Sequence, residues 1–158
     1  MPDSFKILVP VGFSEQSLNA LDQSLIFAKA VDSAEITILA VIEEGGVLRK
    51  TFAATKNGKT VREKVSAKLK EMADEYSAKT GLIFKSMVAE GVVYEEIARV
   101  SDLIEADLVV MGTNGKPQNL KKRFIGSNAY RTALLVKPPV VTIKGVRDIE
   151  KIETIIFP

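Results

Sequence analysis

The residues of this chain that are best suited to chemistry lie in one segment, residues 112–128, which reads GTNGKPQNLKKRFIGSN. Glycines let a backbone adopt positive φ and approach a ligand closely. Where such a segment runs into a helix, the free N–H groups and the positive end of the helix dipole favour an anion. The glycines, and the polar pair at the expected helix start, are Gly112, Gly115, Gly126, Ser127 and Asn128.

The same segment is strongly basic. It carries four cations and no acid, namely Lys116, Lys121, Lys122 and Arg123. Glycines, cations and a helix start together predict a site for a polyphosphate. The spacing matches neither the Walker A pattern GxxxxGK[ST] nor the dinucleotide pattern GxGxxG. Composition leaves one alternative open, a surface loop whose glycines only make turns, whose cations are solvated and whose serine only caps a helix.

Other kinds of chemistry have little support. The 158 residues include no Cys and no His, which removes disulfides, thiolate ligands and the commonest general base. No cluster of carboxylates marks the expected crevice, so a dedicated hydrolytic enzyme is not expected. The net charge of +2 is too small to indicate a nucleic-acid partner. We expect a cytoplasmic protein with no membrane partner, because no apolar run reaches roughly 18 residues and the N-terminus lacks the signal-peptide pattern.

The elements that must position this segment follow from hydrophobic periodicity. Short apolar runs predict strands at residues 5–11, 36–42, 82–89, 107–111 and 140–144. Apolar residues at helical spacing predict helices at residues 14–31, 60–81, 93–104 and 126–135. Ser14 is the expected N-cap of the first helix, and Thr60 with Glu63 fits a capping box at the second. Residues 43–58 are expected to be irregular.

Alternating apolar strands and helices predict an open, doubly wound parallel sheet of five strands, an α/β domain covered by helices on both faces. An α+β fold would need hairpins, and no two-residue hairpin signal separates any pair of strands. Ligands of such sheets bind at the carboxyl ends of strands, where the strand order reverses. If the first and fourth strands are neighbours, residues 10–13 and the glycine-containing segment face one crevice.

Three stretches resemble the universal stress protein family, which is Rossmann-like. ILVPVGFS at residues 7–14, followed by NAL at 19–21, resembles the opening of its members, and AVIEE at 40–44 resembles the end of their second strand. MGTNG at 111–115, with GSN at 126–128, resembles the G-x2-G-x9-G-[ST] signature of the ATP-binding branch. The resemblance covers residues 5–144 and implies the strand order 3-2-1-4-5.

The resemblance also implies a ligand and the residues that hold it. In ATP-binding members, the loop after the first strand and the valine that ends the second strand hold the adenosine, and the Gly/Ser segment holds the phosphates. ATP is the expected ligand, with Mg²⁺ bound through the phosphates and water, and slow ATP turnover is the most enzymatic activity expected. The positions carried over are Pro10, Val11, Gly12, Val41, Met111, Gly112, Gly115, Lys116, Gly126, Ser127 and Asn128.

This chain departs from the family pattern at two places. Gly12 stands where the family usually has an Asp that contacts the nucleoside. Losing a charged hydrogen bond costs about 1.5–3 kcal/mol, which weakens binding more than tenfold. In addition, ten residues separate Gly115 from Gly126 where the signature has nine. An extra residue at a loop tip is cheap for folding but would move Lys116 relative to the phosphates.

Two functions from different classes follow. The first is a nucleotide-binding stress-response protein that acts through nucleotide-dependent contacts of a dimer or of domains. The alternative is an interaction module of the same fold that binds no nucleotide, which Gly12 favours. Association is expected through the strand Val140–Lys144, either as a homodimer or with a second repeat, because an apolar edge strand recruits a partner.

The chain divides into a domain at residues 1–144 and an extension at residues 145–158. TIIFP at residues 154–158 resembles KILVP at residues 6–10, the start of the first strand. The extension is therefore expected to be a linker followed by the start of a second repeat. A strand that pairs within the domain or with a partner chain is the alternative reading of the same five residues.

Overall fold

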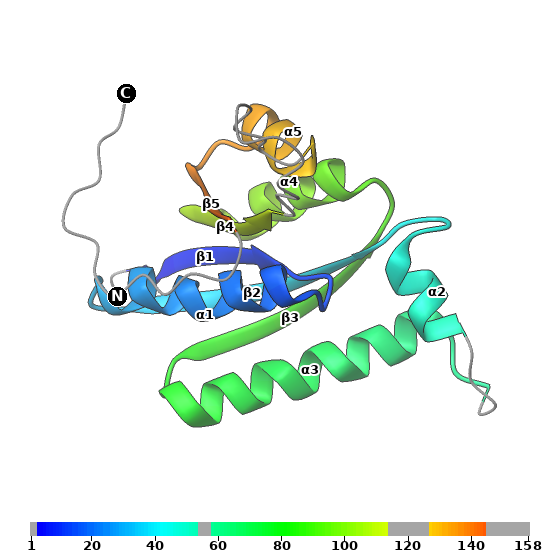
Figure 1. Ribbon diagram of the computed structural model, residues 1–158. Coiled ribbons are helices and arrows are strands. Elements are labelled where there is room, and N and C mark those ends of the chain that lie inside the picture. The colour runs from blue at the N-terminus through cyan, green and yellow to red at the C-terminus, as the bar shows by residue number, and fades with distance from the viewer. Residues whose placement is uncertain (1–2, 54–57, 114–126, 145–158) are drawn as a thin grey trace.

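The computed structural model describes residues 3–53, 58–113 and 127–144, which form a parallel sheet in the order β3-β2-β1-β4-β5 (Figure 1). The strands are β1 (Phe5–Pro10), β2 (Ala34–Ile42), β3 (Ile83–Glu90), β4 (Leu108–Thr113) and β5 (Val140–Lys144). The predicted α/β class and strand order are confirmed, and β3 and β5 lie at the two edges. Residues 145–158, the predicted extension, lie outside the described residues.

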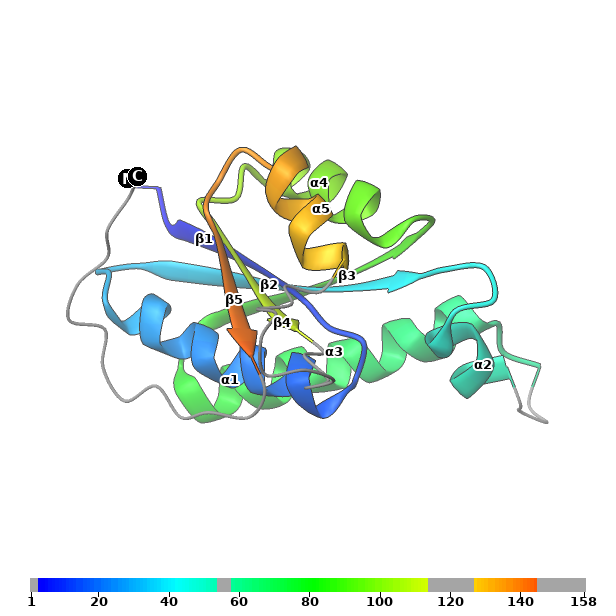
Figure 2. The ribbon, with the colours of Figure 1, turned by 45° about the horizontal axis from the view of Figure 1, so that its top comes forward.

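Helices cover both faces of the sheet (Figures 1 and 2). One face carries α1 (Glu15–Lys29) and α3 (Val61–Thr80), with the short α2 (Val47–Ala53) beside α3, and the other carries α4 (Val93–Ile104) and α5 (Ser127–Leu135). Successive side chains of a strand serve opposite faces, since Ile7 and Val9 belong to the first layer of core while Leu8 belongs to the second. No helix in these described segments is long and apolar enough to cross a membrane.

The helix ends are set by local signals that the sequence contains. Ser14 caps α1 by accepting from the backbone N–H of Ser17 at 3.2 Å, as predicted. Thr60 and Glu63 form the predicted capping box of α3, and the hydrogen bonds from Thr60 lower the pKa of the Glu63 carboxyl. Gly81 ends α3 with a φ of +72°, a conformation that favours glycine.

One polar contact joins the two long helices of the first face. The Tyr76 hydroxyl of α3 donates to a carboxylate oxygen of Asp22 on α1 at 2.5 Å. Burial, together with this hydrogen bond and the nearby negative charge, raises the pKa of the Tyr76 hydroxyl well above its ordinary value. The phenol therefore stays protonated and acts as a donor between the helices.

The prediction that residues 43–58 are irregular is wrong for the part that forms α2 (Val47–Ala53). This helix is only seven residues long, so it shows less than two full turns of periodicity. Leu48 and Phe52, four residues apart, are the side chains that turn inward onto the core. Packing against α3, rather than a strong local signal, makes the segment helical.

Candidate functional site

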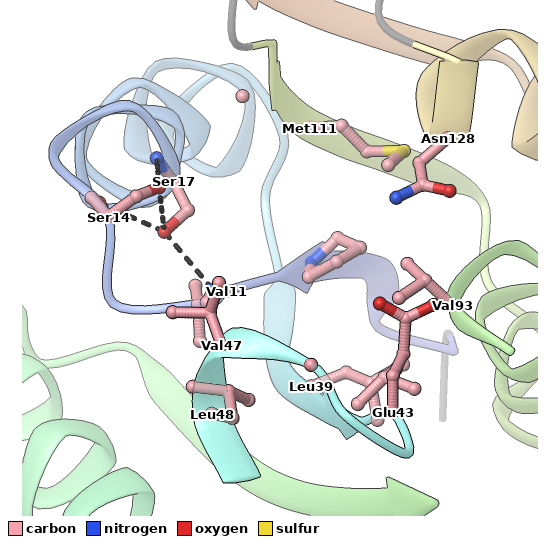
Figure 3. A pocket seen from close by; sticks show the side chains of 15 residues that line it. Val11, Ser14, Ser17, Leu39, Glu43, Val47, Leu48, Val93, Met111 and Asn128 are labelled. Atoms are coloured by element: carbon pink, nitrogen blue, oxygen red, sulfur yellow. Dashed lines mark hydrogen bonds between the residues drawn. The ribbon is translucent and has the colours of Figure 1, made fainter. Parts of the chain in front are cut away.

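A pocket of about 310 Å³ opens at the carboxyl ends of β1, β2 and β4 and is walled by α2 and the start of α5 (Figure 3). This is where the strand order reverses, because β1 and β4 are neighbours, with Ile7 opposite Leu108 and Leu8 opposite Val109. The pairing assumed from the sequence is therefore confirmed. The lining residues are Pro10, Val11, Gly12, Ser14, Ser17, Leu39, Val41, Glu43, Gly46, Val47, Leu48, Val93, Met111, Gly112 and Asn128.

Seven of the residues predicted for the site come together in this pocket. They are Pro10, Val11, Gly12, Val41, Met111, Gly112 and Asn128. Ser127 is the first residue of α5 and is exposed beside it. Gly115, Lys116 and Gly126, like the rest of the basic run, lie outside the described residues. Contact of these positions with a ligand stays a prediction.

Gly112 is required by packing between β4 and α1. A Cβ atom at this position would lie 2.4 Å from the carbonyl oxygen of Gln16 and 3.0 Å from the backbone nitrogen of Ser17. Both atoms belong to the helix backbone, which cannot move aside as a flexible side chain would. The glycine therefore lets the end of β4 lie directly against the first turn of α1, which brings Met111 and Gly112 to the pocket.

Gly12 stands in the opposite situation. A Cβ atom there would meet nothing within 4 Å, and Gly12 is an exposed residue of the pocket lining, so packing does not exclude a side chain. Its backbone N–H donates to the Ser17 hydroxyl at 3.2 Å. That hydroxyl in turn donates to the carbonyl oxygen of Ser14 at 3.0 Å. The loop after β1 is thus fastened to the first turn of α1 although the side chain at Gly12 is missing (Figure 3).

The far wall of the pocket is a turn followed by α2. The backbone N–H of Gly46 donates to the carbonyl oxygen of Glu43 at 3.1 Å, and Gly45 has a φ of +69°. After this turn, Val47 and Leu48 at the start of α2 line the pocket. Sequence reasoning missed this wall, although the turn signal of Gly45 and Gly46 and the helical spacing of Leu48 and Phe52 were present in the sequence.

Contacts outside the pocket hold α2 in place. The rings of Phe52 and Phe13 lie 5.8 Å apart, and the Lys64 ammonium donates to the Phe52 carbonyl oxygen at 2.7 Å. Arg49 of α2 lies 3.6 Å from the Glu90 carboxylate at the end of β3, which Arg62 of α3 also approaches at 3.4 Å. The wall is therefore tied to both β3 and α3.

The lining of the pocket is mostly apolar, with a few polar side chains and one acid. Eight of the fifteen lining residues are apolar and three are glycines. The polar members are Ser14, Ser17, Glu43 and Asn128, and Glu43 is the only charged one in the described lining. Within the same described segments, no three Asp or Glu side chains gather into a metal-binding group. The walls suit a flat heterocycle held by van der Waals contact.

A model of the universal stress protein family matches residues 4–144. The chain belongs to the universal stress protein family. The match spans every element from β1 to β5, so the pocket described above lies wholly within the family domain.

Relatives of known structure or curated sequence agree with this assignment. Universal stress protein MJ0531 of Methanocaldococcus jannaschii is 30% identical over 88% of this chain and 81% of its own length. Universal stress protein MJ0577 of the same archaeon is 27% identical over 88% of this chain and 94% of its own, and its solved structure superposes with a TM-score of 0.65. A universal stress protein family member of Arabidopsis thaliana was solved with AMP bound. It is 17% identical to this chain, and the match covers 88% of this chain and 90% of its own, with a TM-score of 0.63.

Proposed function

We propose that this universal stress protein binds an adenine nucleotide, with ATP as the expected ligand, in the pocket between β1, β2, β4 and α2. The observation that carries the proposal is the gathering of seven predicted residues around one pocket at the point where the strand order reverses. Two further points support the proposal: the pocket includes positions that the resemblance implies for adenosine, and the Arabidopsis relative was solved with AMP bound.

The residues present fit such a ligand. Apolar side chains that include Val41, Val93 and Met111 supply walls for a purine. Asn128, in the first turn of α5, offers an amide to the phosphates beside the positive end of the helix dipole. We propose that Ser127 and the basic glycine segment, residues 114–126, complete the phosphate site, and that any Mg²⁺ binds through phosphates and water.

The proposed role is regulatory: nucleotide binding in a cytoplasmic stress-response protein would alter its association with a second copy. Among the described residues, β5 pairs only with β4 and carries Val140 and Val141, so we propose its outer edge as the place where a partner strand adds. A second repeat beyond residue 144 would use the same edge. The competing function, an interaction module without nucleotide, is favoured by the absence of a side chain at Gly12.

A binding experiment separates the two functions. Denaturing the purified protein and analysing the supernatant detects nucleotide that copurifies, and thermal melts with ATP detect nucleotide that binds. ATP at about 100 times its dissociation constant should raise the free energy of unfolding by about 2.7 kcal/mol. No released nucleotide and no melt shift at millimolar ATP would refute the nucleotide-binding function.

A pair of variants at Gly12 tests the location. Gly12→Leu places a large side chain in the open space beside Gly12 and should abolish the ATP-induced shift while leaving the fold intact. Gly12→Ala adds one methyl group to the same space and is the matched control, which should keep most of the shift. A full shift in Gly12→Leu would place the nucleotide elsewhere on the protein.

A further inference from the structure

Glu43 is the only charged side chain in the described lining of the pocket. It follows β2 directly and is half-buried. Figure 3 shows its side chain among the residues that line the pocket. Within the described parts of the chain, this carboxylate has no ion pair and accepts no hydrogen bond.

The backbone holds Glu43 firmly in this place. On its N-terminal side, the carbonyl oxygen of Ile42 accepts from the Gly91 N–H at 3.1 Å. On its C-terminal side, the Gly46 N–H donates to the carbonyl oxygen of Glu43 at 3.1 Å. A Cβ atom on Gly46 would lie 2.9 Å from the Glu43 Cβ, so this glycine lets the turn close over the acid. The carboxylate is therefore presented from a fixed turn.

An unpaired carboxylate between apolar walls favours some parts of a nucleotide over others. It has two oxygens that only accept hydrogen bonds, and it repels phosphate groups, more strongly where water is excluded. The part of a nucleotide that it favours is therefore neutral and rich in donors. The vicinal hydroxyls of ribose offer two O–H donors side by side, one for each carboxylate oxygen. In dinucleotide-binding α/β folds, an acid beyond the first helix recognises the ribose in this way.

We infer that Glu43 accepts hydrogen bonds from the ribose hydroxyls of the bound nucleotide and makes the pocket specific for ribonucleotides. The inference rests on the proposed nucleotide function. Gly12 lines the same pocket without a side chain, so no second acid from that loop competes for the sugar. The acid that recognises the nucleoside would thus come from the end of β2 instead of the loop after β1.

The test compares ATP with 2′,3′-dideoxy-ATP by thermal melts or calorimetry in EDTA, on the native protein, E43Q and E44Q. The native protein should prefer ATP by about tenfold or more, as expected for charge-assisted hydrogen bonds. In E43Q, that preference should fall by about fivefold or more, because a neutral acceptor replaces a charged one. Affinity for 2′,3′-dideoxy-ATP should hold or rise, since the repulsion of phosphate is removed.

E44Q is the matched control, because Glu44 carries the same charge one residue later, is exposed and does not line the pocket. E44Q should keep the native sugar preference. An unchanged sugar preference in E43Q, or an equal loss in E44Q, would overturn the inference.

Two further comparisons test whether the Glu43 carboxylate instead contacts the adenine base or acts through a metal ion. If E43Q instead loses the preference for ATP over ITP, Glu43 contacts the exocyclic amine of adenine and the inference is wrong. If the preference for ribose is absent in EDTA and returns with Mg²⁺, the acid acts through a metal ion and the inference is again wrong. If no nucleotide binds the native protein, both the proposed function and this inference are wrong. If ATP binds but the sugar preference is unchanged in E43Q, only the inference is wrong.

Discussion

The loop after β1 and the end of β4 each bring one glycine to the same pocket, and the two glycines are there for different physical reasons. At Gly112, a Cβ atom would lie 2.4 Å from the backbone oxygen of Gln16, so packing of the protein against itself excludes a side chain. At Gly12, a Cβ atom would meet nothing within 4 Å, so packing leaves room for a side chain at this edge of the pocket. A glycine beside a pocket is therefore evidence about a ligand only after its neighbours are known.

The largest effect expected from this contrast is at Gly112. Gly112→Ala must push the end of β4 away from the first turn of α1, since both colliding atoms are backbone. Overpacking of this kind costs about 1–3 kcal/mol, and we expect the upper end of that range. Urea unfolding should show a lower midpoint with an unchanged slope. If the free energy of unfolding falls by less than about 0.5 kcal/mol, α1 and β4 separate easily, and packing does not require a glycine at position 112.

An intermediate effect is expected at Ser17, whose hydroxyl joins the loop after β1 to α1. Ser17→Ala leaves the Gly12 N–H without its acceptor and should lower the free energy of unfolding by about 1 kcal/mol. Ser66→Ala, at an exposed position of α3, is the control and should cost nothing. Equal behaviour of the two variants would mean that water satisfies the Gly12 N–H as well as the hydroxyl does.

The smallest effect is expected at Gly12 itself. Gly12→Ala should leave the free energy of unfolding unchanged or raise it by about 0.4–1 kcal/mol, because the unfolded chain loses freedom and the folded chain meets no clash. The same urea titration measures it beside Gly112→Ala. A destabilisation as large as that of Gly112→Ala would break the contrast, because the two positions would then be equally constrained.

The sequence predicted the sheet well because burial imposes a period that can be read locally. β1 and β2 are mostly apolar runs, Ser14 and Thr60 cap helices as expected, and Gly81 ends α3. The strand order came from the resemblance to a family and not from periodicity. It nevertheless placed the predicted residues of β1, β2 and β4 around one pocket.

The other half of the pocket could not be predicted in the same way. Its wall consists of the turn at Gly46 and the short helix α2, whose direction depends on Phe52 meeting Phe13 and Lys64, distant residues of the chain. Glu43 was noticed only as part of a family-like stretch, because no sequence pattern tells which way a side chain after a strand points. Likewise, the reason for Gly112 lies in Gln16, a contact that no spacing rule contains.

The pairing of Arg49 and Arg62 with Glu90 gives the pocket an indirect sensitivity to salt. These ion pairs are largely exposed, so each contributes at most about 1 kcal/mol and weakens as ions screen it. They nevertheless join the pocket wall α2 to the end of β3. Raising the ionic strength therefore loosens the frame around a ligand as well as screening the ligand's own charges. If the proposed nucleotide site is correct, the affinity for a neutral nucleoside should therefore also depend on salt.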